Sequence, residues 1–161
     1  MHENTAAATM YGIDRMDTEK DLHVLIYNMG GRDTEVSVVR YSAVVDSKTN
    51  KTVEMVEILS EAYDETLGGV GFDHCLVKIL TDEFNAMPER AGKQDVRENA
   101  RAMRRLYKES GKIKDVLSAN KITDVKVPEL LDYVTLKFKL DRETYEKACD
   151  NLFGRVQWPI V

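Results

Sequence analysis

The sequence predicts an α+β fold in which a small antiparallel sheet precedes a mainly helical part. Between residues 22 and 59, short segments are rich in β-branched residues or alternate between apolar and polar side chains. Beyond the glycine-rich stretch 67–71, apolar residues recur at helical spacing instead. This change of period predicts two subdomains: a sheet subdomain over residues 1–67, and an outer helical subdomain with its own small sheet over residues 68–161.

The first part is predicted to hold a short helix that ends at Gly12, followed by three antiparallel strands. The strands are expected at residues 23–27, 35–45 and 52–59. A glycine-containing turn joins the first two strands as a hairpin. Because few helices are predicted to cover this sheet, we expect it to expose an apolar face unless something outside this chain packs on it.

The second part is predicted to hold two long helices, two short strands and a last helix. The helices are expected over residues 72–84 and 100–117, and the strands at 124–127 and 133–140, interrupted by Pro128. Pro88 is expected to end the first helix or to lie just past its end. Asp141 is positioned to cap the last helix. Gly111 lies inside the second helix, where glycine costs about 1 kcal/mol relative to alanine, so its place there calls for a reason.

Composition sets limits on the function. The chain has 161 residues, of which 43% are hydrophobic and 32% charged, as is typical of a globular domain. Its net charge of −5 gives no electrostatic reason to expect nucleic acid or an anionic membrane as a partner. No apolar run approaches the roughly 20 residues that span a bilayer. The first 17 residues lack the basic and apolar regions of a secretory signal, so none is expected in this chain.

The two cysteines, Cys75 and Cys149, both lie within amphipathic patterns. The simpler interpretation is a pair of buried structural thiols. The alternative is a redox pair, which would require the two helices to lie side by side. His2, His23 and His74 have no metal-ligand spacing and are expected to be ordinary surface or packed residues.

The turn at Gly30 and Gly31 is the first candidate binding element. Glycines there would expose backbone N–H groups that can cradle phosphate oxygens, but most Gly-Gly hairpins are simply turns. The sequence has no P-loop and no Gly-x-Gly-x-x-Gly before a helix. The basic residues between Arg101 and Lys108 are most simply a solvated helix face, and alternatively a cationic patch for a nucleotide or an acidic partner.

Six stretches of the chain carry a family resemblance. They are residues 6–13, 24–31, 66–73, 95–103, 116–120 and 145–153. Together they resemble the nucleotide-binding domain of the heat-shock protein 70 superfamily, in order from about residue 6 to residue 158. The stretches 95–103 and 116–120 are most similar to its large, hypoxia-up-regulated branch of the endoplasmic reticulum.

This resemblance implies an actin-like ATPase (ribonuclease H-like) fold of which this chain holds only the second lobe. The sheet subdomain would correspond to subdomain IIA, incomplete here, and the helical subdomain to IIB. The first lobe, a glycine-rich adenosine loop and the substrate-binding domains would lie outside this chain. The resemblance implies ATP or ADP with Mg²⁺ as cofactor of the full-length protein. We expect none in the fragment, and no ATP hydrolysis by it, because positioning catalysis needs both lobes around the phosphates.

Six residues match functional positions of the family. They are Gly30 and Gly31 of the second phosphate loop, Gly68 and Gly69 of the hinge into the outer subdomain, and Lys114 and Ser118 on the adenosine side. The resemblance therefore implies that the hairpin tip and the helix bearing Lys114 form one wall of a cleft. It assigns no catalytic residue and no metal ligand to this chain.

Five positions depart from the family pattern. They are Asn28 in place of an acidic residue, Arg32 and Asp33 in place of a glycine and a threonine, Gly111 in place of a glutamate, and Asp115 in place of an arginine. A neutral Asn28 holds magnesium-bound water less firmly than a carboxylate, and Asp33 brings negative charge near polyphosphate, which Arg32 could offset. Asp115 lacks a cation–π contact worth about 1 kcal/mol. We therefore predict weaker nucleotide binding and poorer hydrolysis than in an ordinary family member.

Three functions follow from these observations. The first is part of the ATP-binding domain of a large chaperone of the endoplasmic reticulum lumen, which would bind unfolded polypeptide through domains absent here. The second is a nucleotide-exchange module that grips a partner 70-kDa chaperone, or other co-chaperones, through its outer subdomain, with weak or no ATPase activity of its own. The third ignores the resemblance: a small α+β interaction domain without a ligand.

Overall fold

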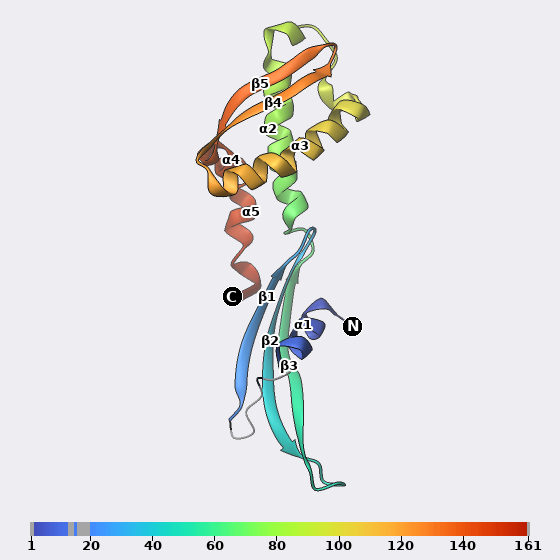
Figure 1. The fold of residues 1–161 in the computed structure, drawn as a ribbon, viewed down its shortest axis with the longest axis vertical. Helices are drawn as coiled ribbons and strands as arrows, with labels where there is room; N and C mark the ends of the chain where they lie inside the picture. Colours follow the sequence, from blue (N-terminus) through green and yellow to red (C-terminus); the bar gives the residue numbers. More distant parts are fainter. Residues whose placement is uncertain (1, 13–14, 16–19, 161) are drawn as a thin grey trace. The chain divides into compact units, whose positions relative to one another are not determined.

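The computed structural model of the chain describes residues 2–12, 15 and 20–160. Contacts divide the chain into two compact units (Figure 1). The sheet unit comprises Met1–Gly68 with Val156–Val161, and the helical unit comprises Gly69–Arg155. The C-terminal residues, assigned above to the outer subdomain, thus group with the sheet unit. Helices and antiparallel sheets are combined in the described chain, which confirms the mixed α+β class. Ile13, the end of the first resembling stretch, lies outside the described residues.

The sheet unit is a three-stranded antiparallel meander. Its strands are β1 (Leu22–Met29), β2 (Thr34–Val45) and β3 (Thr52–Asp64), in the order β1-β2-β3. The predicted hairpin is confirmed, since Met29 pairs with Thr34 across the turn. A shift of register between Val38 and Val39 marks a bulge opposite β3.

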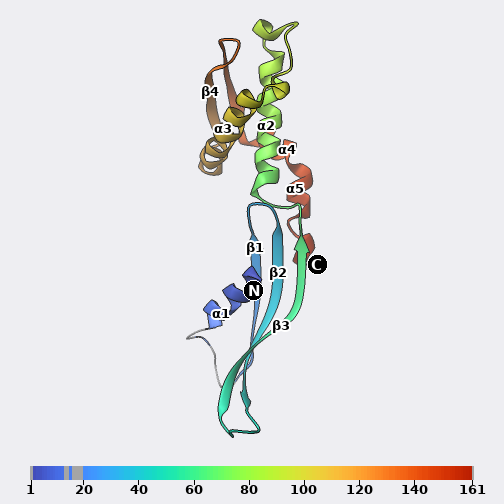
Figure 2. The same cartoon turned by 90° about the vertical axis from the view of Figure 1, so that its right-hand side faces the viewer.

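Helix α1 (Glu3–Gly12) covers one face of this sheet and ends at Gly12, as predicted (Figure 2). Ala8 packs there with Val39 and Tyr41, and the buried Tyr41 hydroxyl donates to the Ala8 carbonyl at 2.7 Å. Burial is also the main cause that raises the pKa of Tyr41. Leu25 lies on the opposite face and is 47% exposed. The sheet therefore leaves apolar surface uncovered, as expected from the few helices predicted to cover it.

The helical unit contains two long helices, a two-stranded sheet and two short helices. Its elements are α2 (Gly69–Ala86), α3 (Ala100–Ala119), β4 (Ile122–Leu131), β5 (Val134–Asp141), α4 (Arg142–Ala148) and α5 (Asp150–Arg155), with short 3₁₀ turns at Pro88–Arg90 and Val96–Glu98. A third 3₁₀ turn, Trp158–Ile160, belongs to the sheet unit. Both long helices are confirmed, and Pro88 lies just past the end of α2.

Two details differ from the sequence-based expectation. Strand β4 continues past Pro128, but its pairing with β5 is interrupted between Val127 and Leu131, because proline has no N–H to donate. The single predicted last helix is divided at Cys149, where the chain leaves helical geometry before α5 begins. The predicted cap is confirmed: the Asp141 carboxylate accepts the Thr144 N–H at 2.7 Å, and this bond is the main cause that lowers the pKa of Asp141.

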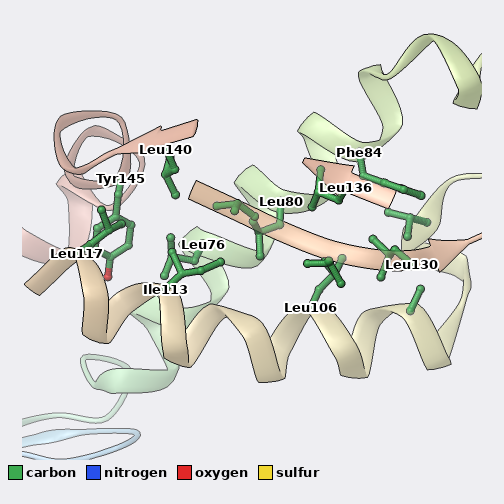
Figure 3. Packing of buried hydrophobic residues seen from close by; sticks show 14 of the residues in the cluster. Leu76, Leu80, Phe84, Leu106, Ile113, Leu117, Leu130, Leu136, Leu140 and Tyr145 are labelled. Carbon is green, nitrogen blue, oxygen red and sulfur yellow. The ribbon is translucent and has the colours of Figure 1, made fainter. Parts of the chain in front are cut away.

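The core of the helical unit lies between α2, α3 and the β4–β5 sheet. Figure 3 shows Leu76 and Leu80 of α2, Leu106 and Ile113 of α3 and Leu136 of β5 converging there. All five side chains are buried, which gives this unit its main hydrophobic stabilisation. None of the helices in the described ranges is long and apolar enough to cross a membrane.

Replacing Gly111 with alanine should stabilise the helical unit by about 1 kcal/mol. A Cβ built at Gly111 meets no atom within 4 Å, so packing does not require glycine there. Gly92→Ala is the matched control. A Cβ at Gly92 would also meet no atom within 4 Å, but the φ angle of Gly92 is +72°, a conformation that costs free energy for any residue with a side chain. Urea unfolding followed by helical circular dichroism should show opposite signs for the two variants. A loss of stability in Gly111→Ala would contradict this account.

Candidate functional site

The tip of the β1–β2 hairpin presents the backbone at Gly31. The Gly30 N–H donates to the Asp33 carbonyl at 2.9 Å, which closes the turn between the two strands. A Cβ built at Gly31 would meet nothing within 4 Å. Within the described part of the chain, no hydrogen bond occupies the Gly31 amide. The turn can therefore offer this N–H, and not that of Gly30, to an anion without rearrangement.

An acidic pocket of about 320 Å³ adjoins the beginning of β2. Four carboxylates contribute to its lining: Asp33, Glu35, Glu61 and Glu65. This concentration of negative charge disfavours bare polyphosphate but favours a phosphate that arrives with its own divalent cation. The negative charge of Asp33, which the sequence analysis noted, is thus one of four carboxylate charges that line this pocket.

Glu3 is a polar residue of this region that sequence reasoning missed. Its carboxylate accepts a hydrogen bond from the Asn28 side-chain amide at 2.9 Å. Asn28 lies one residue before the end of β1, and Glu3 begins α1, so the contact joins the helix to the hairpin. An acidic residue in the first turn of a helix is common, because it interacts favourably with the helix dipole. The sequence alone therefore gives no sign that Glu3 also contacts Asn28.

Gly68 lies very close to the backbone of the hairpin tip. A Cβ at this position would lie 2.5 Å from the carbonyl carbon of Arg32 and 2.7 Å from the amide nitrogen of Asp33. The chain segment that leaves β3 therefore packs directly on the hairpin tip. The Thr34 hydroxyl reinforces this contact by donating to the Leu67 carbonyl at 2.7 Å. The boundary between the two units falls immediately after Gly68.

Lys114 and Ser118 lie one turn apart on α3 and line the same shallow pocket of about 220 Å³. The Lys114 ammonium forms an ion pair with the Asp73 carboxylate at 2.5 Å and lies 3.4 Å from the Gly69 carbonyl. The Ser118 hydroxyl donates to the Asp115 carbonyl at 2.6 Å. Both polar groups thus already have intramolecular partners, which a ligand at this pocket would have to replace or share.

Arg142 lines the same pocket and was not identified from the sequence. Its guanidinium donates to the carbonyls of Leu117 at 2.8 Å, Asn120 at 3.1 Å and Ser118 at 3.3 Å. These are carbonyls at the C-terminal end of α3, where a cation is favoured by the helix dipole. Arg142 is contributed by the start of α4, so only the tertiary fold brings it to this pocket.

The structure thus brings Lys114 and Ser118 together within the helical unit, and it places Gly30 and Gly31 in the sheet unit. The predicted cleft that would join these two pairs stays a prediction. Among the described residues, no group of three or more His, Cys, Asp or Glu side chains is arranged to hold a metal ion.

Comparisons with known proteins agree on one family. The sequence profile of the family described as "Hsp70 protein" matches residues 1–161. Over 99% of its length, the chain is 36% identical to Hypoxia up-regulated protein 1 of Xenopus laevis and 34% identical to the proteins of that name in Danio rerio and Homo sapiens. The chain spans 25% of the Xenopus protein and 16% of the other two. The chain is therefore a member of the Hsp70 protein family.

Proposed function

We propose that this chain forms part of the ATP-binding domain of a large Hsp70-family chaperone of the endoplasmic reticulum lumen. The sheet unit would serve as the phosphate-side part, and the helical unit as the adenosine-side part, of the second lobe of an actin-like fold. Family membership and the similarity to proteins named Hypoxia up-regulated protein 1 support this proposal. Co-chaperones and unfolded polypeptides are the partners that we propose for the complete protein.

The observation that carries the proposal is the uncovered Gly31 backbone at the hairpin tip. Its N–H has no intramolecular acceptor among the described residues, and the absence of a side chain leaves room for a phosphate oxygen. The Gly30 N–H already closes the turn, so its role is to hold the backbone in position. The bound magnesium ion would supply charge neutralisation beside the carboxylates of Asp33 and Glu35.

The other proposed site residues would act through position. Lys114 would direct its ammonium toward the adenosine side. Its existing ion pair with Asp73 lowers the binding free energy that a new contact with a ligand would contribute. Ser118 would offer its hydroxyl oxygen as a hydrogen-bond acceptor, because its proton is donated to the Asp115 carbonyl. Gly68 and Gly69 would act as the hinge, at the boundary between the two units. Because Lys114 and Ser118 already have intramolecular partners, we expect nucleotide binding to be weak. The departures from the family sequence pattern lead to the same expectation.

Gly31→Ala tests the proposal in the complete protein that contains this chain. A methyl group at the tip would obstruct the phosphate, so we expect the dissociation constant of Mg-ADP to rise at least about tenfold, equivalent to about 1.4 kcal/mol. Isothermal titration calorimetry measures this effect. The substitution should leave the urea midpoint unchanged, because no protein atom lies near the added Cβ. Unchanged affinity in the folded variant would contradict the proposed phosphate contact.

A further inference from the structure

Cys75 and Cys149 lie next to each other in the helical unit. Cys75 is part of α2, and Cys149 directly follows α4. Cys149 belongs to the buried core cluster of this unit, Cys75 packs against the same cluster, and neither forms a disulfide in this structure. The condition that the sequence set for a redox pair, two helices side by side, is therefore met by the fold.

Packing on both sides fixes this juxtaposition. Helices α2 and α4 contact each other directly (Figure 1). One helical turn before Cys75, the Phe72 ring packs against the Phe153 ring of α5, with 5.1 Å between the ring centroids. Cys149 itself belongs to the buried core cluster, and Cys75 packs against that cluster. Both cysteines are therefore held in place by the surrounding core, and neither lies on a loose surface segment.

The two thiols differ in access. Cys149 is completely buried, whereas Cys75 is only partly buried and can be reached from solvent. Burial and the neighbouring Cys75 thiol both raise the pKa of Cys149. Burial, and to a smaller extent the neighbouring Cys149 thiol, also raise the pKa of the Tyr145 hydroxyl. This asymmetry resembles that of an attacking thiol and a resolving thiol, with Cys75 as the residue that meets an external reagent.

We propose that Cys75 and Cys149 are a redox-active dithiol, which a disulfide reagent converts into an intramolecular disulfide between α2 and α4. The Cys75 thiolate attacks one sulfur of the reagent, forms a mixed disulfide and releases the first thiolate. The Cys149 thiol loses its proton to solvent and attacks the Cys75 sulfur, and the second thiolate leaves. The protein is thus oxidised by two electrons and the reagent is reduced to two thiols. This proposal is independent of nucleotide binding.

Incubation of the chain with oxidised glutathione tests the proposal. After the remaining thiols are blocked with iodoacetamide under denaturing conditions, peptide mass spectrometry should show Cys75 linked to Cys149, with no stable glutathione adduct. Dithiothreitol should restore both free thiols. A stable glutathione adduct on Cys75 beside a reduced Cys149, or dimers linked between chains, would overturn the proposal.

Two variants separate the roles of the thiols. Cys149→Ser removes the resolving thiol, so Cys75 should accumulate as a mixed disulfide with glutathione. Cys75→Ser should leave Cys149 unmodified on the same time scale, because that thiol is buried. Circular dichroism of both reduced variants checks that the fold is retained. If Cys149 becomes glutathionylated in folded Cys75→Ser as fast as Cys75 does in Cys149→Ser, the proposed order of attack is wrong.

The midpoint of thermal unfolding of the wild-type chain should also rise when the disulfide forms and return to its original value on reduction.

Discussion

Gly68→Ala should lower the free energy of unfolding of the sheet unit by about 3 kcal/mol. The added Cβ would lie 2.5 Å and 2.6 Å from the carbonyl carbon and the amide nitrogen of Arg32. These are backbone atoms, which cannot rotate away as the end of a side chain can. Either the β1–β2 turn or the segment after β3 must therefore shift. The fluorescence of Trp158, which belongs to the sheet unit, can follow this unfolding in urea.

Gly31→Ala is the matched control within the same unit. It also replaces a glycine near the hairpin tip, but its Cβ would meet no atom within 4 Å. We expect its effect on stability to stay within about 0.5 kcal/mol. Equal losses for the two variants would show that chain conformation, and not the approach to Arg32, makes glycine necessary at position 68.

The reason for Gly68 illustrates what the sequence can and cannot predict. The family resemblance marks Gly68 and Gly69 as a hinge pair, but at Gly68 the structure shows a second reason for glycine, a backbone neighbour that leaves no room for a side chain. That neighbour, Arg32, is brought there by the pairing of β2 with β3. A glycine required by a tertiary contact has the same appearance in the sequence as one required by a turn.

The long periodic elements were the most predictable part of the fold. Helices α2 and α3 each maintain an apolar stripe over several turns, and a repeated pattern of that length excludes a strand. The division of the last helix at Cys149 was missed, because its apolar residues continue the helical spacing through the break. Periodicity records which side chains face the core, and it does not record where backbone hydrogen bonds stop.

The same distinction applies to the candidate site. Lys114 and Ser118 are four positions apart on one helix, so their common face follows directly from helical geometry. The pairing of Glu3 with Asn28, and the approach of Arg142 to the end of α3, each join different elements. Such contacts depend on the packing of those elements, which the local pattern of one sequence does not encode.

Arg90 is the clearest case of a residue whose role only the fold reveals. It lies in the charged connector of residues 89–94 after α2, and arginine is mostly exposed in proteins, yet Arg90 is only 3% exposed. Its guanidinium pairs with Asp132, donates to the Gln94 carbonyl and lies 5.0 Å from the centre of the Phe84 ring. The connector is therefore fixed to the core through a buried cation.

Arg90→Ala should destabilise the helical unit by about 3 kcal/mol, because it removes a buried guanidinium with its hydrogen bonds and leaves a cavity beside Phe84. Arg97→Ala is the matched control, since Arg97 also forms ion pairs, with Asp82 and Asp95, but its side chain is 41% exposed. Its loss should lower the free energy of unfolding by about 1 kcal/mol or less. Urea unfolding followed by helical circular dichroism compares the two. Asp132→Asn keeps the shape of the side chain but removes its negative charge. Its loss of unfolding free energy should lie between those of the two arginine variants. A similar cost for Arg90→Ala and Arg97→Ala would mean that burial adds nothing to the Arg90 pair, and the connector would then be held by its backbone alone.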